Sequence, residues 1–151
     1  KEVKEIKLDI AVDAYVSSEF VKEESERIAI YSKISELFTV EQFENLKSEL
    51  ESSIGELPKE TINLMKIGLL KNLAQDNYVQ RVVMNDKECK FVLYKQEKIV
   101  TDEIAAALKE FRNETSLQFE KDPIINFKLS INSDEKLDFL IKFLSFKKSE
   151  N

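Results

Sequence analysis

The stretch Glu49-Leu-Glu-Ser-Ser-Ile-Gly-Glu-Leu-Pro58 lies near the middle of the chain and decides its fold. An amphipathic helix runs into Gly55, where the chain turns, and Pro58 begins the next helix. Glycine suits a helix end because it adopts the left-handed backbone conformation without strain. Proline suits a helix start because its missing N–H would have no intrahelical partner there. The residues before this stretch predict a helical bundle, and those after it predict a sheet with covering helices.

Two amphipathic helices are predicted before Gly55. In the first, over about residues 22–38, residues at helical spacing are expected to face the core: Ile28, Tyr31, Ile34 (or Ser35) and Phe38, widened by Ile30 and Leu37. The second helix begins at a capping box formed by Thr39 and Gln42. Its core stripe has the same spacing and consists of Phe43, Leu46, Leu50 and Ile54.

A third helix is predicted over about residues 59–75, and it is apolar around most of its circumference. We therefore expect it to be the central and most buried helix of the bundle. Gly68 lies in its middle, where glycine costs roughly 1 kcal/mol relative to alanine. A close crossing with another element is the expected compensation for that cost.

Alternating apolar and polar residues predict strands outside the helical part. Residues 4–10 alternate strictly and indicate a half-buried strand. Residues 78–84 and 89–94 are expected to form a hairpin closed by Asn85-Asp86-Lys87. A second strand pair is predicted at residues 117–120 and 125–131, with one face buried and one wet.

Two further helices are predicted, one after each of these strand pairs. Thr101 is expected to cap a helix over about residues 102–112, and Ser133 to cap one over about residues 134–146. Their core stripes are expected to be Ile104, Ala105, Leu108 and Phe111 in the former, and Leu137, Leu140, Ile141 and Leu144 in the latter.

The element order βααα-ββα-ββα predicts an α+β fold. An N-terminal strand and an antiparallel three-helix bundle are followed by a mainly antiparallel sheet (ββαββα) with two covering helices. We expect a single domain over residues 1–151, with a helical part at about 12–76 and a sheet-plus-helix part at about 77–149.

Composition excludes most kinds of catalytic site. The 151 residues carry a net charge of −6, no histidine, one cysteine and two glycines. An internal disulfide, histidine-based catalysis and a glycine-rich phosphate loop are therefore ruled out. Cys89 lies in an alternating apolar run and is expected to be a buried small hydrophobe. We expect no catalytic, cofactor-binding or metal-binding residue in the chain.

Composition also bears on location. No apolar run approaches the ~18 residues of a membrane span, and no signal peptide is visible, so a cytoplasmic location is expected. The first residue is Lys1, which predicts a fragment of a longer protein.

Three interpretations of function remain open on composition and pattern. The exposed flank of the second helix carries an acidic strip, Glu44, Glu49 and Glu51, which could pair with arginines of a partner protein or be a solvated helix face. A small enzyme using carboxylates and tyrosines would need converging carboxylates in a pocket. A nucleic-acid module would use lysines of the exposed sheet face, against the net negative charge: Lys90, Lys95, Lys98 and Lys128.

Several separated motifs resemble one family. They are Asp13-Ala-Tyr-Val16, Arg27 with Ile30-Tyr31, Glu49-Leu50, Gly55, Leu57-Pro58 and Asn63-Leu64. In order and spacing they resemble the C-terminal domain of bacterial transcription-repair coupling factors (Mfd), over about residues 13–73. The sequence departs from the family pattern at Ser17, where the family has proline, and at Ser52-Ser53-Ile54, where it has Asp-Arg-Phe.

The resemblance implies a regulatory domain without catalytic activity or a cofactor of its own. In that family the domain packs on a UvrB-like module of the same polypeptide and masks the surface that binds UvrA. The parent is a DNA translocase that displaces stalled RNA polymerase and recruits nucleotide excision repair. Its ATP- and Mg-dependent motor, which also binds DNA, lies upstream of this domain, and no membrane is involved.

The resemblance also implies which residues meet the partner. The family binds its partner through two acidic side chains near the end of the second helix. Glu49 stands at the first of these positions and Ser52 at the second, so the second charge is missing. Glu51 is the candidate to supply that charge instead. Structural roles are implied for the remaining motif residues: Asp13, Ala14, Tyr15, Arg27, Tyr31, Gly55 and Pro58. Of these, Arg27 and Tyr31 are assigned to internal packing.

Overall fold

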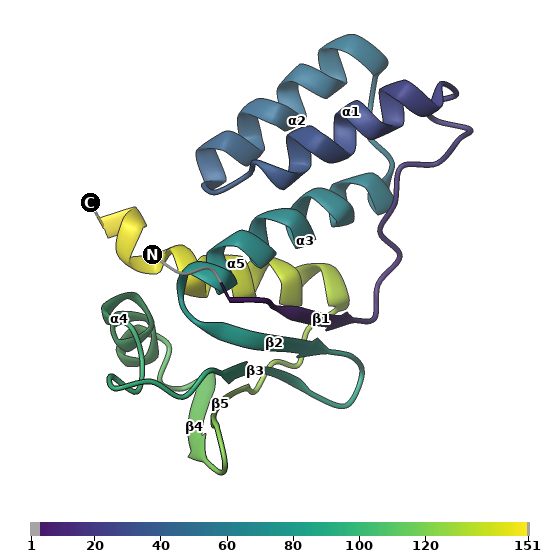
Figure 1. Cartoon of the computed structure of the whole chain (residues 1–151). Coiled ribbons are helices and arrows are strands. Elements are labelled where there is room, and N and C mark those ends of the chain that lie inside the picture. Colours follow the sequence, from purple (N-terminus) through teal and green to yellow (C-terminus); the bar gives the residue numbers. More distant parts are fainter. Residues whose placement is uncertain (1–3, 151) are drawn as a thin grey trace. The chain divides into compact units, whose positions relative to one another are not determined.

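The computed structural model describes the backbone of residues 4–150 and the side chains of residues 4–146. Within that range, five helices and five strands confirm the predicted α+β fold (Figure 1). The strands are β1 (Lys7–Ile10), β2 (Val79–Met84), β3 (Cys89–Leu93), β4 (Thr115–Phe119) and β5 (Pro123–Phe127). The helices are α1 (Glu24–Ser35), α2 (Val40–Ile54), α3 (Lys59–Asp76), α4 (Asp102–Glu110) and α5 (Ser133–Glu150).

The chain divides into two compact units. The helical unit is Val12–Asn72, and the sheet unit holds the described residues up to Ala11 together with those from Leu73 onward. Each unit has its own buried apolar residues, among them Leu50 and Met65 in the helical unit and Phe91 and Ile125 in the sheet unit.

Helix α2 begins where the sequence predicts, with a variation on the capping box. The Thr39 side chain accepts a hydrogen bond from the Gln42 N–H at 3.0 Å. The Gln42 side chain reaches one residue further back than a capping box requires, because its Oε1 accepts from the Phe38 N–H at 2.8 Å. Both bonds give partners to N–H groups around a helix start, and α2 therefore begins sharply at Val40.

The turn between α2 and α3 depends on Gly55 and Pro58. Gly55 has φ +92° and ψ −172°, a backbone region that is essentially reserved for glycine, and its N–H donates to Glu51 O at 3.0 Å. Pro58 lies immediately before α3, and its carbonyl accepts from the N–H groups of Thr61 and Ile62, each at 3.1 Å. Proline therefore lies just before the helix, where a backbone N–H would have no intrahelical partner and none is lost.

The buried face of α1 is narrower than the predicted one. Ile28, Tyr31 and Phe38 are 60%, 42% and 45% exposed, so the prediction that they face the core was wrong. Ile30, Ile34 and Leu37, which were also predicted to face the core, are buried. The apolar residues of α1 lie at helical spacing on more than one side, so periodicity could not separate the buried members of the predicted stripe from the exposed ones. Phe38 also lies beyond the helix, which ends at Ser35.

The predicted close crossing at Gly68 is present and involves α1. A Cβ placed on Gly68 would lie 2.5 Å from Ile34 Cγ2 and 3.2 Å from the Ile34 carbonyl oxygen. These distances are shorter than van der Waals contact, so α1 and α3 lie too close together for a side chain at position 68. Asn72, one turn further along α3, donates to the carbonyls of Ser35 and Leu37 at 3.0 and 2.7 Å and fixes the end of α1.

The sheet unit is a five-stranded sheet with the order β1-β2-β3-β5-β4. Strand β1 pairs with β2 in parallel, and the other neighbours are antiparallel. The β2–β3 turn is closed by Asn85, whose side-chain oxygen accepts from the N–H groups of Lys87 and Glu88 at 2.8 and 3.0 Å. The N-terminal strand thus pairs with a strand that lies some 70 residues later in the chain, as in the pair Lys7 and Arg81.

One face of this sheet is covered by an aromatic core. Phe91 of β3 and Phe127 of β5 pack edge to face, with ring centroids 4.8 Å apart, and both contact Phe143 of α5. Phe111, at the end of α4, packs on Phe139 of α5 at 5.2 Å. Such aromatic pairs contribute stability beyond their buried area.

Three local predictions in the sheet unit were wrong. Strand β5 ends at Phe127, opposite Thr115, the first residue of its partner β4, and one further backbone bond joins the Lys128 N–H to Glu114 O at 2.7 Å. Helix α4 buries Ala107, while Ala105 is exposed. At the start of α5 the capping side chain is Asn132, which accepts from the Glu135 N–H at 2.9 Å, and Ser133 is already helical.

Candidate protein–protein interface

The C-terminal half of α2 presents one exposed carboxylate, Glu49. Its Oε2 lies 2.5 Å from the ammonium of Lys33 on α1, and the side chains of Lys33 and Glu49 are 53% and 56% exposed. The residues that follow Glu49 at helical spacing are Ser52 and Ser53, both exposed, and Ser53 Oγ donates to Glu49 O at 3.2 Å. We call Glu49, Ser52 and Ser53 the Glu49 face.

Glu51 lies on a different side of α2. Residues three and four apart share a helix face, whereas residues two apart do not. Glu51 is half-buried, and its carbonyl accepts the Gly55 N–H. Ser52 therefore shares the face of Glu49, and Glu51 does not add its charge to that face.

The electrostatics of this helix end favour a basic partner. The last turn of α2 has no basic residue, so the negative end of its dipole is not neutralised from within the helix. Glu56 is exposed just beyond it. A carboxylate and a helix C-terminus on one surface attract arginine or lysine side chains of another protein.

The Asp13 motif anchors the irregular segment before α1. Asp13 O accepts from the Asn63 side chain at 3.1 Å, and Tyr15 exchanges bonds with α3, donating to Glu60 O at 3.1 Å and accepting from Thr61 Oγ1 at 3.3 Å. Between them Ala14 is half-buried. The motif therefore holds irregular backbone against the start of α3.

Arg27 and Tyr31 of α1 form hydrogen bonds with the backbone of the later part of that segment. The Arg27 guanidinium donates to Val21 O and Lys22 O at 2.7 and 2.8 Å. The Tyr31 hydroxyl accepts from the Val16 N–H at 3.2 Å. Both side chains contact backbone of their own unit, which is a structural use of an arginine and a tyrosine.

The sequence interpretation missed Lys33. It lies sixteen positions before Glu49 on a separate helix, and only the antiparallel packing of α1 and α2 brings the two charges together. Its position near the end of α1 was the available signal, because cations are favoured at helix C-termini.

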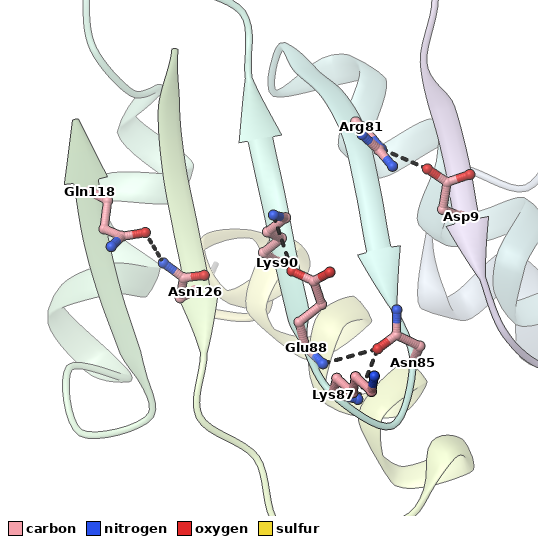
Figure 2. Close-up of polar contacts among 8 residues, drawn as sticks. All are labelled: Asp9, Arg81, Asn85, Lys87, Glu88, Lys90, Gln118 and Asn126. Atoms are coloured by element: carbon pink, nitrogen blue, oxygen red, sulfur yellow. Dashed lines mark hydrogen bonds and ion pairs between the residues drawn. The ribbon is translucent and has the colours of Figure 1, made fainter. Parts of the chain in front are cut away.

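The outer face of the sheet carries polar side-chain pairs, two of which join neighbouring strands (Figure 2). Arg81 Nε lies 2.6 Å from Asp9 Oδ2, Lys90 Nζ lies 3.1 Å from Glu88 Oε1, and Asn126 Nδ2 donates to Gln118 Oε1 at 2.6 Å. Lys90 was one of the lysines considered for binding nucleic acid, and its charge is met by a carboxylate of the same unit.

A second of those lysines is also paired. Lys98 lies 2.8 Å from Asp102, and the hydrogen bond to that carboxylate raises the pKa of the lysine. Two of the four candidate cations are therefore neutralised locally. This arrangement disfavours a basic stripe along the sheet.

Two observations concern metal binding and the reactivity of the thiol. Among the described residues, no group of three or more histidine, cysteine, aspartate or glutamate side chains is arranged to hold a metal ion. Cys89 is buried, and burial raises the pKa of its thiol to about 11, partly offset by the charge of Lys136. A thiol with that pKa is a weak nucleophile at neutral pH, because the thiolate is the reactive form.

No helix among the described residues is both long enough and apolar enough to cross a bilayer.

The structure thus defines an α+β domain of two compact units with an exposed acidic helix face. The profile of the TRCF domain family matches residues 10–104. The chain belongs to the TRCF domain family, and the resemblance inferred from the separated motifs is confirmed.

Similar proteins carry the same family name. The transcription-repair-coupling factor of Borreliella burgdorferi is 25% identical over 147 residues, which cover 96% of this chain and 13% of that protein. The transcription-repair-coupling factor of Staphylococcus aureus (strain USA300) is 33% identical over 70 residues, 46% of this chain and 6% of that protein. The chain therefore spans a small part of the length of these relatives.

A solved structure has the same fold. It is the crystal structure of the C-terminal domain of a transcription-repair coupling factor, with a TM-score of 0.81 and 23% sequence identity. The match covers 100% of this chain and 99% of the solved chain.

Proposed function

We propose that this chain is the noncatalytic C-terminal regulatory domain of a transcription-repair coupling factor. It packs on the UvrB-like module of the same polypeptide and masks the surface that binds UvrA. Membership of the TRCF domain family supports the first statement. The observation that carries the second is the exposed carboxylate of Glu49 on a helix end that favours a basic partner.

The rest of the proposed parent follows from the family. It is a DNA translocase that displaces stalled RNA polymerase and recruits nucleotide excision repair through UvrA. An upstream motor binds ATP and Mg, and this domain needs no cofactor to act. Its role is a coupling between domains, in which the docked state excludes UvrA and the undocked state admits it.

The composition of the Glu49 face sets the expected strength of the contact. Ser52 and Ser53 are uncharged, so Glu49 alone supplies a formal charge there. A single charge-assisted hydrogen bond supports an interaction that is easily reversed, and we expect micromolar affinity between separated fragments. Weak docking suits a mask that must be released.

The test is a titration of the chain with the separately produced UvrB-like module at low salt. Wild-type chain should bind, and Glu49→Gln should weaken binding by about 1–3 kcal/mol if the contact is desolvated. Glu44→Gln is the matched control, because Glu44 is also exposed on α2 but lies off the Glu49 face. Absence of binding by folded wild-type chain would remove the masking role, and equal effects of both variants would move the interface elsewhere.

A further inference from the structure

The contact between Lys33 and Glu49 bears on how the Glu49 face is regulated. We propose that Lys33 is a built-in competitor that occupies Glu49 in the undocked chain and weakens docking. This inference rests on the proposed function, in which Glu49 receives a basic group of the UvrB-like module. The basic group must displace Lys33 or share the carboxylate with it.

The geometry explains why Lys33 holds this position. Its ammonium lies 2.5 Å from Glu49 Oε2, and it is the basic residue of the last turn of α1. The negative end of the α1 dipole and the Glu49 carboxylate therefore both stabilise the ammonium. Both side chains remain about half exposed, so an incoming group can reach the pair from solvent.

Two physical effects make Lys33 a competitor. A guanidinium binds a carboxylate best through both oxygens, and Lys33 already occupies Oε2. Its positive charge also repels the basic group that approaches the same carboxylate. A lysine that merely oriented Glu49 for the partner would have the opposite effect, because its removal would weaken docking.

The experiment compares Lys33→Gln with Lys47→Gln in the same titration against the UvrB-like module. Each variant changes the net charge of the chain from −6 to −7, so overall steering is equal in both. Lys47 lies on α2 two positions before Glu49, and therefore on another side of the helix. We expect Lys33→Gln to bind about two to five times more tightly than Lys47→Gln, the range of an exposed ion pair.

A second comparison tests whether the effect passes through Glu49. In a Glu49→Gln background the Lys33 substitution should lose most of its gain, because the carboxylate for which it competes is gone. Circular dichroism of all variants checks that the ion pair is not needed for folding.

The outcomes separate the two proposals. If wild-type and Lys33→Gln chains both fail to bind, the proposed function falls and this inference falls with it. If Glu49→Gln weakens binding while Lys33→Gln leaves it unchanged or weakens it, the proposed function stands and the competitor role is refuted. A gain that persists undiminished in the Glu49→Gln background also refutes it.

Discussion

Replacing Gly68 by alanine tests the close approach of α1 and α3. The new methyl group would lie 2.5 Å from Ile34 Cγ2 and 3.2 Å from the Ile34 carbonyl oxygen. Cγ2 is attached directly to the β-carbon of a β-branched residue, so it cannot swing away as the end of a long side chain can. The backbone oxygen is still less free to move.

Two terms of opposite sign decide the result. Alanine is favoured over glycine within a helix by about 1 kcal/mol. Overpacking a buried contact costs about 1–3 kcal/mol, and the two short distances place this site at the upper end. We therefore expect Gly68→Ala to lower the free energy of unfolding by about 1–2 kcal/mol.

Urea unfolding followed by far-ultraviolet circular dichroism measures this change. Ile34→Leu removes the branch methyl at Cγ2 while conserving volume, and costs less than about 1.5 kcal/mol by itself. Combined with Gly68→Ala, its effect should be clearly smaller than the sum of the two single effects. Ser48→Ala, on the exposed part of α2, controls for the gain in helix propensity alone.

A rise in stability on Gly68→Ala would refute this reasoning. It would mean that helix propensity outweighs the crowding and that the two helices have room to separate. Strict additivity with Ile34→Leu would show that the Ile34 side chain is not the obstacle.

Three further substitutions have effects that the same unfolding measurement checks. Gly55→Ala should cost about 1–3 kcal/mol through backbone strain alone, because its φ is +92° and a Cβ would meet no atom within 4 Å; unchanged stability would mean that the turn relaxes freely. Thr39→Ala should cost about 1 kcal/mol, because the Gln42 N–H loses its acceptor, and no loss would show that water replaces the cap. Burial raises the pKa of the Cys89 thiol from 9.0 to about 11, so the unfolded chain loses this proton at lower pH than the folded chain does. As the pH rises from 9.0 to about 11, the free energy of unfolding of the wild-type chain should therefore fall by about 2 kcal/mol relative to that of Cys89→Ala. Parallel pH profiles of the two chains would contradict the burial of the thiol.

Helix ends and turns could be predicted from single residues whose type favours one local backbone structure. Thr39, Gly55 and Asn85 each satisfy or bend the backbone within a few residues, and each acts where the sequence placed it. The glycine in the third helix also predicted a close crossing, although its partner Ile34 could not be named. Interactions between residues close together in the chain can be predicted from the sequence because they do not depend on the rest of the fold.

Features set by tertiary packing could not be predicted. Periodicity placed Ile28 on the same core face as Ile34, but only Ile34, which lies at the crossing with Gly68, is buried. The parallel pairing of β1 with β2 joins residues far apart in the chain. The pairing of Lys33 with Glu49 depends on how two helices pack, and it changes the interpretation of the candidate interface from a free charge to an occupied one.

Competition between the chain and UvrA measures whether the UvrA-binding surface is masked. UvrA is titrated onto the isolated UvrB-like module with and without saturating wild-type chain, with the Glu49→Gln chain as the control at equal concentration. We predict that wild-type chain reduces UvrA binding and that Glu49→Gln reduces it much less. Unaltered UvrA binding, with wild-type chain shown to be bound to the module, would mean that the chain does not mask the UvrA-binding surface.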